Sequence, residues 1–317
     1  MSRSGKRVVV ALGGNALEEK GLPPTAESQL KVLKKTAKYL AKLYSAGYEL
    51  AIVHGNGPQV GRILLASEAS SDLTPSMPFD VCGAMSQGYI GYHIQQTLSD
   101  ELKKQGINAP VVTIVTQIVV DNNDPAFSDP TKPIGPFYSK EEAEKLVEER
   151  GYTIKEDSGR GWRRVVASPA PHKIMEIETI KNLCYNDTIT ISCGGGGIPV
   201  VEDENGFTKG VAAVIDKDLA AEKLAEELDA DILLILTQVP AVAINFNTLN
   251  QRNLSNVTVR EMETYANDGQ FGAGSMLPKV NAAVAFVKSA KGRKSIITSL
   301  NLGLDALEGK CGTSITE

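Results

Sequence analysis

The feature that most constrains the fold is a strand, a glycine-containing turn and a helix, which occur in this order twice near the start of the chain. The apolar run Arg7–Leu12 leads into Gly13, Gly14 and Asn15, and an apolar stripe then predicts a helix over 28–45. A second strand over 49–54 leads into Gly55, Asn56 and Gly57, and a helix is predicted over 59–69. This alternation predicts βαβ units with right-handed crossovers and a parallel sheet.

The alternation of strand and helix patterns continues along the chain. Further strands are predicted at 110–116, 188–193, 232–236 and 295–298, and further helices at 85–105, 173–186, 217–227 and 278–290. The alternation breaks over 121–164, which is rich in Pro, Asp, Gly and charge and contains a short predicted helix near 141–150. An excursion of this length in a compact domain is usually functional, so we interpret it as an inserted lid; a plain surface excursion is the alternative.

Composition excludes several classes of protein. The net charge is −5 and no basic stretch carries interleaved aromatic residues, which argues against nucleic acid as a partner. The four cysteines have no zinc-ligand or C-x-x-C spacing, so we expect reduced thiols in a cytoplasmic protein. The apolar run 8–12 is too short for a signal peptide, and no run reaches membrane-spanning length.

Three glycine segments follow predicted strands: 13–15, 55–57 and 194–197. Ligands of parallel sheets bind beyond the carboxyl ends of the strands, where glycine lets backbone N–H groups approach phosphate. One such turn can serve geometry alone, but three together predict a phosphate site. The P-loop motif is absent, and Gly55-x-Gly57-x-x-x-Gly61 has one residue too many for a dinucleotide fingerprint.

Two lysines lie where a helix is predicted to begin. Lys217 stands between Asp216 and Asp218, and Lys279 follows Pro278. The aspartates can act as caps, but a cation is unfavourable at the positive end of a helix dipole unless it faces an anion. Lys132 in the excursion is a third candidate. Each lysine alone could be a solvated surface residue; the two helix-start lysines together predict a bound phosphate.

Histidine is scarce, and this bears on the chemistry. The three histidines form no Ser-His-Asp or Cys-His arrangement. An anionic carboxylate or carbamate oxygen needs no general base, because attack on a γ-phosphate then requires only positioning and charge neutralisation. The residues therefore predict phosphoryl transfer to a small anionic acid.

Eight segments resemble the carbamate kinase family, which has the amino acid kinase fold, over essentially the full length. The segments are 11–16, 54–61, 82–88, 124–127 with 130–133, 156–162, 194–199, 213–218, and 274–276 with Pro278 and Lys279. The Cys82–Gly88 stretch, the Pro-Thr-Lys-Pro stretch and the Ser-Gly-Arg-Gly-Trp stretch are specific to that family.

The resemblance implies a three-layer αβα sandwich with a mainly parallel central sheet and a small lid inserted at about 121–164, in one domain over 1–317. It implies an N-terminal lobe (about 1–210) for carbamate or carbamoyl phosphate and a C-terminal lobe (about 211–317) for the nucleotide. It further implies reversible transfer between ATP and carbamate with Mg²⁺, a homodimer, and ATP formation where arginine deiminase fermentation operates.

The resemblance also implies roles for residues. The catalytic residues would be Lys132 from the lid, Lys217 and Lys279 as charge-neutralising groups, and Asp216, which would orient the lysines. Substrate would be bound by Gly13, Gly14, Asn15, Gly55, Asn56, Gly57, Gly195 and Gly196. The nucleotide would be bound by Gly194, Thr237, Val239, Gly274, Ser275 and Met276. No metal ligand is assigned.

The chain departs from the family pattern at Gln238, where an Asp is usual, and at Gln270 and Leu277, where His and Gly are usual. None of these removes a proposed catalytic group. Two alternatives stay open: another amino acid kinase, acting on acetylglutamate or aspartate, and a non-catalytic sensor of nucleotide or carbamoyl phosphate.

Overall fold

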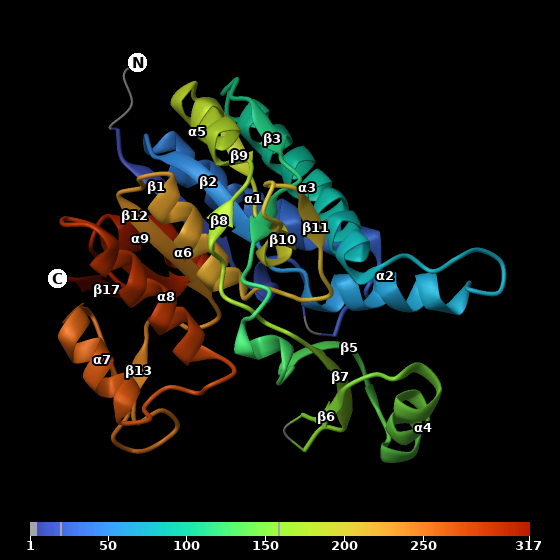
Figure 1. Cartoon of the computed structure of the whole chain (residues 1–317). Helices are drawn as coiled ribbons and strands as arrows, with labels where there is room; N and C mark the ends of the chain where they lie inside the picture. Colours follow the sequence, from blue (N-terminus) through green and yellow to red (C-terminus); the bar gives the residue numbers. More distant parts are fainter. Residues whose placement is uncertain (1–4, 20, 158) are drawn as a thin grey trace.

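The computed structural model describes residues 5–19, 21–157 and 159–317 of the 317-residue chain. Ser158 of the Ser-Gly-Arg-Gly-Trp stretch and the first four residues of the basic N-terminus lie outside the described residues. Figure 1 shows helices on both sides of a central sheet, with a smaller body beside it at the lower right.

The central sheet has eight strands in the order β15-β17-β16-β12-β1-β2-β9-β3. Its strands are β1 (Arg7–Leu12), β2 (Glu49–His54), β3 (Val111–Thr113), β9 (Ile189–Ile191), β12 (Ile232–Thr237), β15 (Asn256–Thr258), β16 (Lys294–Ser299) and β17 (Thr313–Thr316). Every neighbouring pair is parallel except β16 with β17. The predicted parallel sheet is confirmed.

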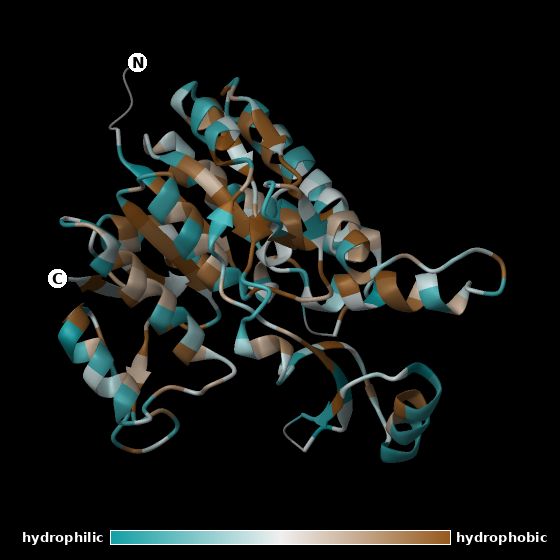
Figure 2. Ribbon diagram, viewed as in Figure 1, coloured by the Kyte–Doolittle hydropathy of each residue, from teal (hydrophilic) through white to brown (hydrophobic). Residues whose placement is uncertain are grey.

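Side-chain alternation along the strands creates two cores, one on each face of the sheet (Figure 2). In β1, Val8, Val10 and Leu12 pack with α1 (Ala26–Ser45), α3 (Phe79–Lys104) and α9 (Gly303–Leu307). Val9 and Ala11 pack with α5 (Ile177–Tyr185), α6 (Lys217–Glu227) and α8 (Met276–Ser289). The fold is therefore the three-layer αβα sandwich that the resemblance implied.

A second sheet corrects one prediction. Its strands are β4 (Gln117–Val119), β8 (Lys173–Ile174), β10 (Ile198–Glu202) and β11 (Thr208–Gly210), in the order β11-β10-β4-β8. The helix predicted over 173–186 begins at Ile177, because Lys173 and Ile174 pair antiparallel with β4. A two-residue strand has no periodicity that a sequence could reveal.

Two other boundaries also differ from prediction. Helix α3 begins at Phe79, six residues before Met85, because the Phe79 side chain is buried against α2 (Gly57–Ala69). The strand predicted over 110–116 ends at Thr113, and the chain then crosses to the second sheet. There the Thr116 backbone bonds both to the Gln87 side chain and to the N–H of Ile198 at the start of β10.

The excursion forms a separate three-stranded sheet, β5-β7-β6, with one helix on it. Its elements are β5 (Lys132–Tyr138), α4 (Lys140–Arg150), β6 (Ile154–Glu156) and β7 (Trp162–Val166). Ser139 and Glu142 form a capping box at the start of α4, and Gly151 ends it in the left-handed conformation. We call residues 121–166 the lid segment.

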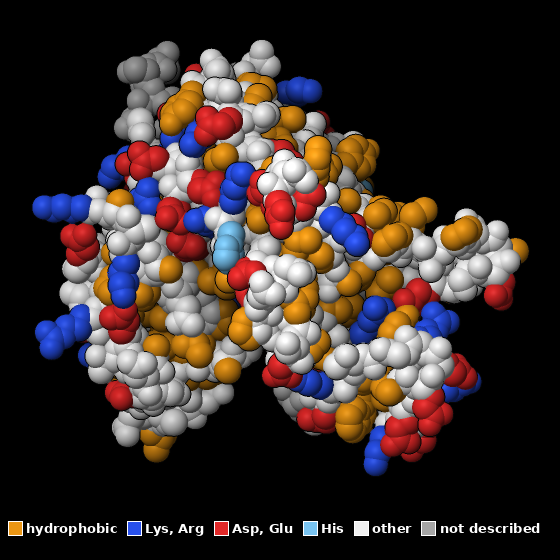
Figure 3. All heavy atoms as spheres, viewed as in Figure 1, with side chains coloured by type: hydrophobic (Ala, Val, Ile, Leu, Met, Phe, Trp, Pro, Cys, Tyr) orange, Lys and Arg blue, Asp and Glu red, His pale blue; other side chains and the backbone are white. Residues whose placement is uncertain are grey.

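The remaining elements lie near the C-terminal half of the central sheet. The short strands β13 (Ala243–Ile244) and β14 (Arg252–Asn253) form a hairpin close to α7 (Val259–Asn267). In the space-filling view the molecule is hollowed between this part and the lid segment (Figure 3). Among the described residues, no helix is both long and apolar enough to cross a membrane.

Candidate active site

Glycine turns follow the carboxyl ends of three neighbouring parallel strands, β1, β2 and β9. A Cβ on Gly55 would lie 3.3 Å from Cδ of Lys217, so the lysine side chain runs directly over this turn. Gly195 has φ +68°, and a Cβ there would lie 2.2 Å from Nδ2 of Asn56. Gly195 requires glycine because its φ is positive and the Asn56 side chain occupies the space of a Cβ, whereas a Cβ on Gly55 would only be tight against the Lys217 side chain.

A buried polar network joins these turns to α3. Nε2 of Gln87 donates to the carbonyls of Thr116 (3.1 Å) and Gly194 (2.9 Å), and its Oε1 accepts from the Thr116 N–H (2.9 Å). Ser86, the preceding residue, accepts a 2.8 Å bond from Nδ2 of Asn56. Buried hydrogen bonds contribute about 1 kcal/mol each, so this network keeps the turns in one conformation.

His54 is buried at the end of β2. Its Nδ1 lies 2.8 Å from the Gly55 carbonyl, to which it donates. Burial lowers the pKa of His54 to about 4, although this hydrogen bond acts in the opposite direction. His54 is therefore neutral near pH 7, and its proton is committed to the backbone.

The lid cavity lies between the glycine turns, α2 and the lid segment, with a volume of about 220 Å³. Its lining residues are Gly14, Leu17, Glu18, Gly55, Asn56, Gly57, Pro58, Gln59, Val60, Lys132, Pro133, Ile134, Gly195, Val214, Ile215 and Lys217. The start of α2 faces this cavity, and free N–H groups at a helix start favour an anion. A space of this size suits a small acid.

The C-terminal cavity lies beyond the end of β12, with a volume of about 500 Å³. It is lined by Thr237, Gln238, Val239, Pro240, Ala241, Ala243, Phe246, Gln251, Asn253, Gln270, Phe271, Gly272, Ser275, Met276 and Lys279. Most of its surface is apolar, with two phenylalanines and several amides, as in pockets for larger cofactor-sized ligands.

Asp218 joins the two cavities. Its Oδ1 accepts from the ammonium group of Lys217 at 2.5 Å, and its Oδ2 accepts from that of Lys279 at 2.9 Å. Lys217 lines the lid cavity and Lys279 lines the C-terminal cavity. Two cations from different helices are thereby held together at the boundary between a small and a large site.

The electrostatics of Asp218 explain how this cluster persists. The residue is 2% exposed. Burial alone would raise the pKa of Asp218, but the ammonium groups of Lys217 and Lys279 outweigh it and the pKa is lowered. Asp218 is therefore ionised, and it offsets part of the repulsion between the two lysines.

Asp216 has a different partner from the one expected. Its Oδ1 caps α6 by accepting from the Asp218 N–H at 2.9 Å, and its Oδ2 accepts from the Lys132 ammonium at 2.6 Å. Of the three predicted lysines, Asp216 contacts Lys132, and its orienting role stays a prediction. The reason is helix geometry: at the N-cap the Asp216 side chain faces the lid, while Asp218 in the first turn faces α8.

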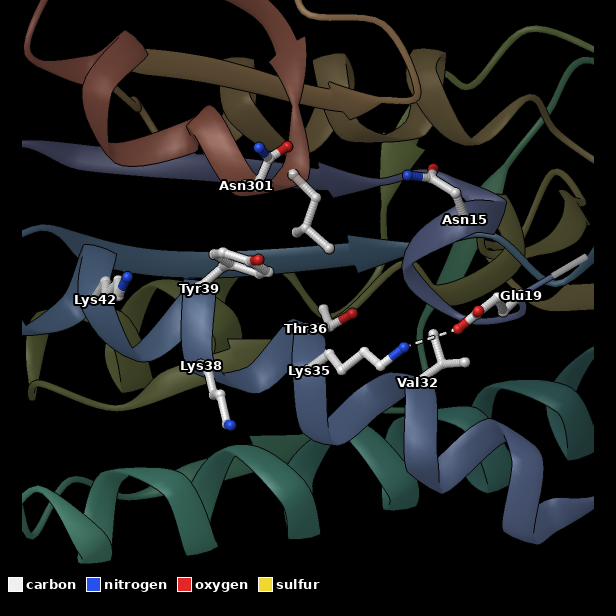
Figure 4. A pocket seen from close by; sticks show the side chains of 10 residues that line it. Asn15, Glu19, Val32, Lys35, Thr36, Lys38, Tyr39, Lys42 and Asn301 are labelled. Carbon is white, nitrogen blue, oxygen red and sulfur yellow. Dashed lines mark hydrogen bonds and ion pairs between the residues drawn. The ribbon is translucent and has the colours of Figure 1, made fainter.

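A further hollow lies between α1, the turn after β1 and residues 300–301 (Figure 4). It is lined by Asn15, Glu19, Val32, Lys35, Thr36, Lys38, Tyr39, Lys42, Leu300 and Asn301. Lys35 is paired with Glu19 at 2.9 Å, and Lys38 and Lys42 are exposed. Of the residues predicted for the site, it contains Asn15 alone, so we place the functional site at the other two cavities.

Most predicted site residues line one of these two cavities. The lid cavity contains Gly14, Gly55, Asn56, Gly57, Gly195, Lys132 and Lys217, and the C-terminal cavity contains Thr237, Val239, Ser275, Met276 and Lys279. Gly274 precedes α8 and lines neither. Gly13 donates its N–H to the Leu236 carbonyl (3.1 Å), and Nδ2 of Asn15 donates to the Thr237 carbonyl (3.3 Å), so both support the turn.

In the turn after β9, Gly194 and Gly196 line neither of the two cavities. Gly194 was expected on the nucleotide side, but it packs against His54, where a Cβ would lie 2.4 Å from Nε2. The strand order explains this, because β9 and the nucleotide-side strand β12 flank the β1–β2 pair on opposite sides. Gly196 lets the chain pass close to the Ile215 carbonyl, because a Cβ at this position would lie 2.1 Å from the carbonyl oxygen.

Sequence reasoning missed three residues that organise the site. In the sequence Asp218 is only an acid beside Lys217, but in the structure it contacts both lysines. Gln87 and Ser86 lie in the Cys82–Gly88 stretch, which the resemblance marked without giving its members a role. The polar Ser-Gln pair inside an otherwise small and apolar helix segment was the available signal.

Comparisons with known proteins agree with this geometry. Residues 6–299 match the model of the amino acid kinase family, and the chain belongs to that family. It is 55% identical to a carbamate kinase of Pyrococcus horikoshii over 313 residues (98% of this chain, 99% of the relative) and 54% identical to one of Clostridium perfringens (98% and 100%). Within the family, the chain belongs to the carbamate kinases.

Solved structures give the same result. Carbamate kinase from Giardia lamblia bound to AMP-PNP superposes with a TM-score of 0.93 and 45% identity, covering 100% of this chain and 99% of that one. N-acetylglutamate synthase from Neisseria gonorrhoeae, at 16% identity and a TM-score of 0.58, shares the fold alone.

Proposed function

We propose that the chain is a carbamate kinase that catalyses ATP + carbamate = ADP + carbamoyl phosphate in both directions. The observation that carries this proposal is the Lys217–Asp218–Lys279 bridge between a 220 Å³ cavity and a 500 Å³ cavity. The Giardia relative binds AMP-PNP, an ATP analogue, which supports a nucleotide site in this fold.

Carbamate would occupy the lid cavity and the nucleotide the C-terminal cavity. This assigns the acceptor to the N-terminal lobe, about 1–210, and the nucleotide to the C-terminal lobe, about 211–317. The glycine turns and the start of α2 would bind the carboxylate oxygens and the transferred phosphoryl group through backbone N–H groups. Thr237, Val239, Ser275 and Met276 would contact the nucleotide.

The lysines supply the charge stabilisation. As a carbamate oxygen forms its bond to the γ-phosphorus, the bond from phosphorus to the ADP oxygen breaks and ADP leaves. Negative charge spreads over the phosphoryl oxygens in this transition state. Lys217 and Lys279 would neutralise it from the two cavities, and Lys132 would do so from the lid segment.

No general base is required for this step, because the carbamate oxygen is already anionic. His54 does not offer one: it is buried, neutral, and donates its Nδ1 proton to the Gly55 carbonyl. The chemistry therefore rests on positioning and electrostatics.

We propose that Mg²⁺ arrives with the nucleotide. Mg²⁺ is commonly bound by substrate phosphates, water and one or two carboxylates, not by a protein cage. The described residues contain no group of three or more His, Cys, Asp or Glu side chains that could form such a cage, which fits a nucleotide-borne ion. Its chemistry would be to neutralise the β- and γ-phosphate oxygens.

The first test is a coupled assay for ATP formation from ADP and carbamoyl phosphate. We expect turnover that depends on both substrates. Activity with N-acetylglutamate or aspartate instead of carbamate would favour another amino acid kinase, although a 220 Å³ cavity leaves little room for their side chains. Nucleotide binding without any turnover would favour a sensor and contradict the proposal.

We further propose a cytoplasmic homodimer that forms ATP at the end of arginine deiminase catabolism. Helix α3 carries exposed apolar side chains on one stripe, Val81, Met85 and Tyr92, and Met77 just before it is also exposed. A second copy covering this stripe would remove apolar surface from water. Light scattering that gives the mass of one chain would contradict the dimer.

A further inference from the structure

Glu68, in the last turn of α2, contacts three residues of the lid segment. Its carboxylate accepts hydrogen bonds from the Tyr152 hydroxyl and from Nη1 of Arg164 (3.2 Å), and Nη1 of Arg150 lies 3.5 Å away. The Arg164 guanidinium also lies 3.7 Å from the centre of the Tyr152 ring. The Glu68 side chain is 16% exposed, so solvent screens this cluster only in part.

These contacts lead to Lys132 through the lid sheet. In the pairing of β5 with β7, Arg164 lies opposite Ile134, and Val166 lies opposite Lys132. Arg164, which binds Glu68, is therefore only two residues before Val166, the residue paired with Lys132. A shift of Arg164 would displace β7, and β5 with it.

The same strand packs directly on α2. Ile134 is 1% exposed and shares a small core with Val60 and Leu64 of α2. A Cβ on Gly61 would lie 2.6 Å from the Gly135 backbone, so helix and strand meet backbone to backbone. The strand is thus held on the first half of α2 and, through Lys132, on Asp216, and Glu68 adds a contact at the far end of the helix.

Helix α2 thus connects two parts of one site. Its first residues, Gly57 to Val60, line the lid cavity, and Glu68 lies at its other end. A helix of 13 residues is about 20 Å long and behaves as a stiff rod. In Figure 1 α2 extends from the body of the molecule over the lid segment, which carries Lys132 back to the lid cavity, where it meets Asp216 at 2.6 Å.

We infer that Glu68 is a positioning residue for Lys132: by binding Arg164, Arg150 and Tyr152 it fixes the angle of the lid sheet on α2. The inference rests on the proposed function, because Lys132 acts on the transferring phosphoryl group. The competing interpretation is that Glu68 stabilises the fold without any bearing on Lys132.

A double-mutant cycle separates the two interpretations. Misplacing a catalytic group by about 1 Å can cost roughly 100-fold in rate, so we expect Glu68→Ala to lower kcat for ATP formation roughly 10- to 100-fold. In a Lys132→Ala background the same substitution should have no further effect on kcat. The loss of thermal stability should be equal in both backgrounds, because it does not involve the lysine.

Controls keep the result interpretable. Glu149→Ala removes the same charge from the exposed face of α4, where Glu149 pairs with Lys145 at 3.7 Å, and should leave kcat unchanged. If Glu68→Ala does not fold, Tyr152→Phe removes one of the three contacts and should produce a smaller loss of the same kind. Equal losses of kcat in the presence and absence of Lys132 would overturn the inference.

The wild-type assay distinguishes the two levels of failure. An active wild type with a Glu68→Ala variant of unchanged kcat would refute the positioning role and leave the proposed function standing. A wild type that forms no ATP from ADP and carbamoyl phosphate would refute both.

Discussion

Replacing Lys217 with alanine is expected to lower kcat for ATP formation by 100- to 1,000-fold while the protein stays folded. Lys217 packs over Gly55 in the lid cavity and pairs with Asp218 at the boundary, so in the proposed function its ammonium group faces the transferring phosphoryl group. Removing one preorganised stabiliser of transition-state charge typically costs about 10²- to 10³-fold. The measurement is steady-state kinetics with varied ADP and varied carbamoyl phosphate.

The relative changes in kcat and KM test the proposed role of Lys217. Because the proposed function assigns Lys217 to the transferring group, kcat should fall much more than KM for ADP rises. Lys223→Ala is a matched control on the same helix: Lys223 pairs with Glu226 at 2.9 Å and lines neither cavity. Turnover of Lys217→Ala within a factor of two of wild type would refute the role of this lysine.

Replacing Asp218 with asparagine is expected to impair both activity and stability. The substitution keeps the size of the side chain but removes the charge that holds Lys217 and Lys279 together. Removing one partner of a buried ion pair costs about 3–5 kcal/mol; the two lysine side chains are 15% and 17% exposed, which reduces this to roughly 2 kcal/mol. We expect kcat to fall about 100-fold, because both ammonium groups lose their position.

The stability effect has a defined dependence on pH. The pKa of Asp218 in the folded protein is lowered from its ordinary 3.8. Its ionised form therefore stabilises the fold above that value, and this contribution is lost as the pH falls through the lower folded pKa. The difference in unfolding free energy between wild type and Asp218→Asn should be full at pH 7 and should narrow below about pH 4.

Urea unfolding at several pH values measures this difference. Asp229→Asn makes the same chemical change just beyond the other end of α6, where Asp229 is largely exposed and pairs with Arg293 at 2.9 Å. It should change stability by less than about 0.5 kcal/mol and leave kcat unaffected. A difference between wild type and Asp218→Asn that stays constant from pH 7 to pH 3 would show that the Asp218 charge is not responsible.

The sequence by itself determined the parts that depend on local patterns. The apolar run Arg7–Leu12 with the glycine turn after it predicts a buried parallel strand, and the structure places this strand inside the central sheet. The lysines at predicted helix starts were identified because a cation there conflicts with the helix dipole. The excursion was recognised because Pro, Gly and charge interrupt the alternation.

Only the tertiary structure decided which groups meet. Asp218 contacts Lys279 across 61 positions and Lys132 contacts Asp216 across 84, and no local periodicity encodes such pairs. Gly194 lies beside His54 and away from β12, because the order of strands in a sheet is set by packing and not by order in the chain. Glu68 gave no signal at all, since one acid on a polar helix face acquires meaning only when the lid folds onto it.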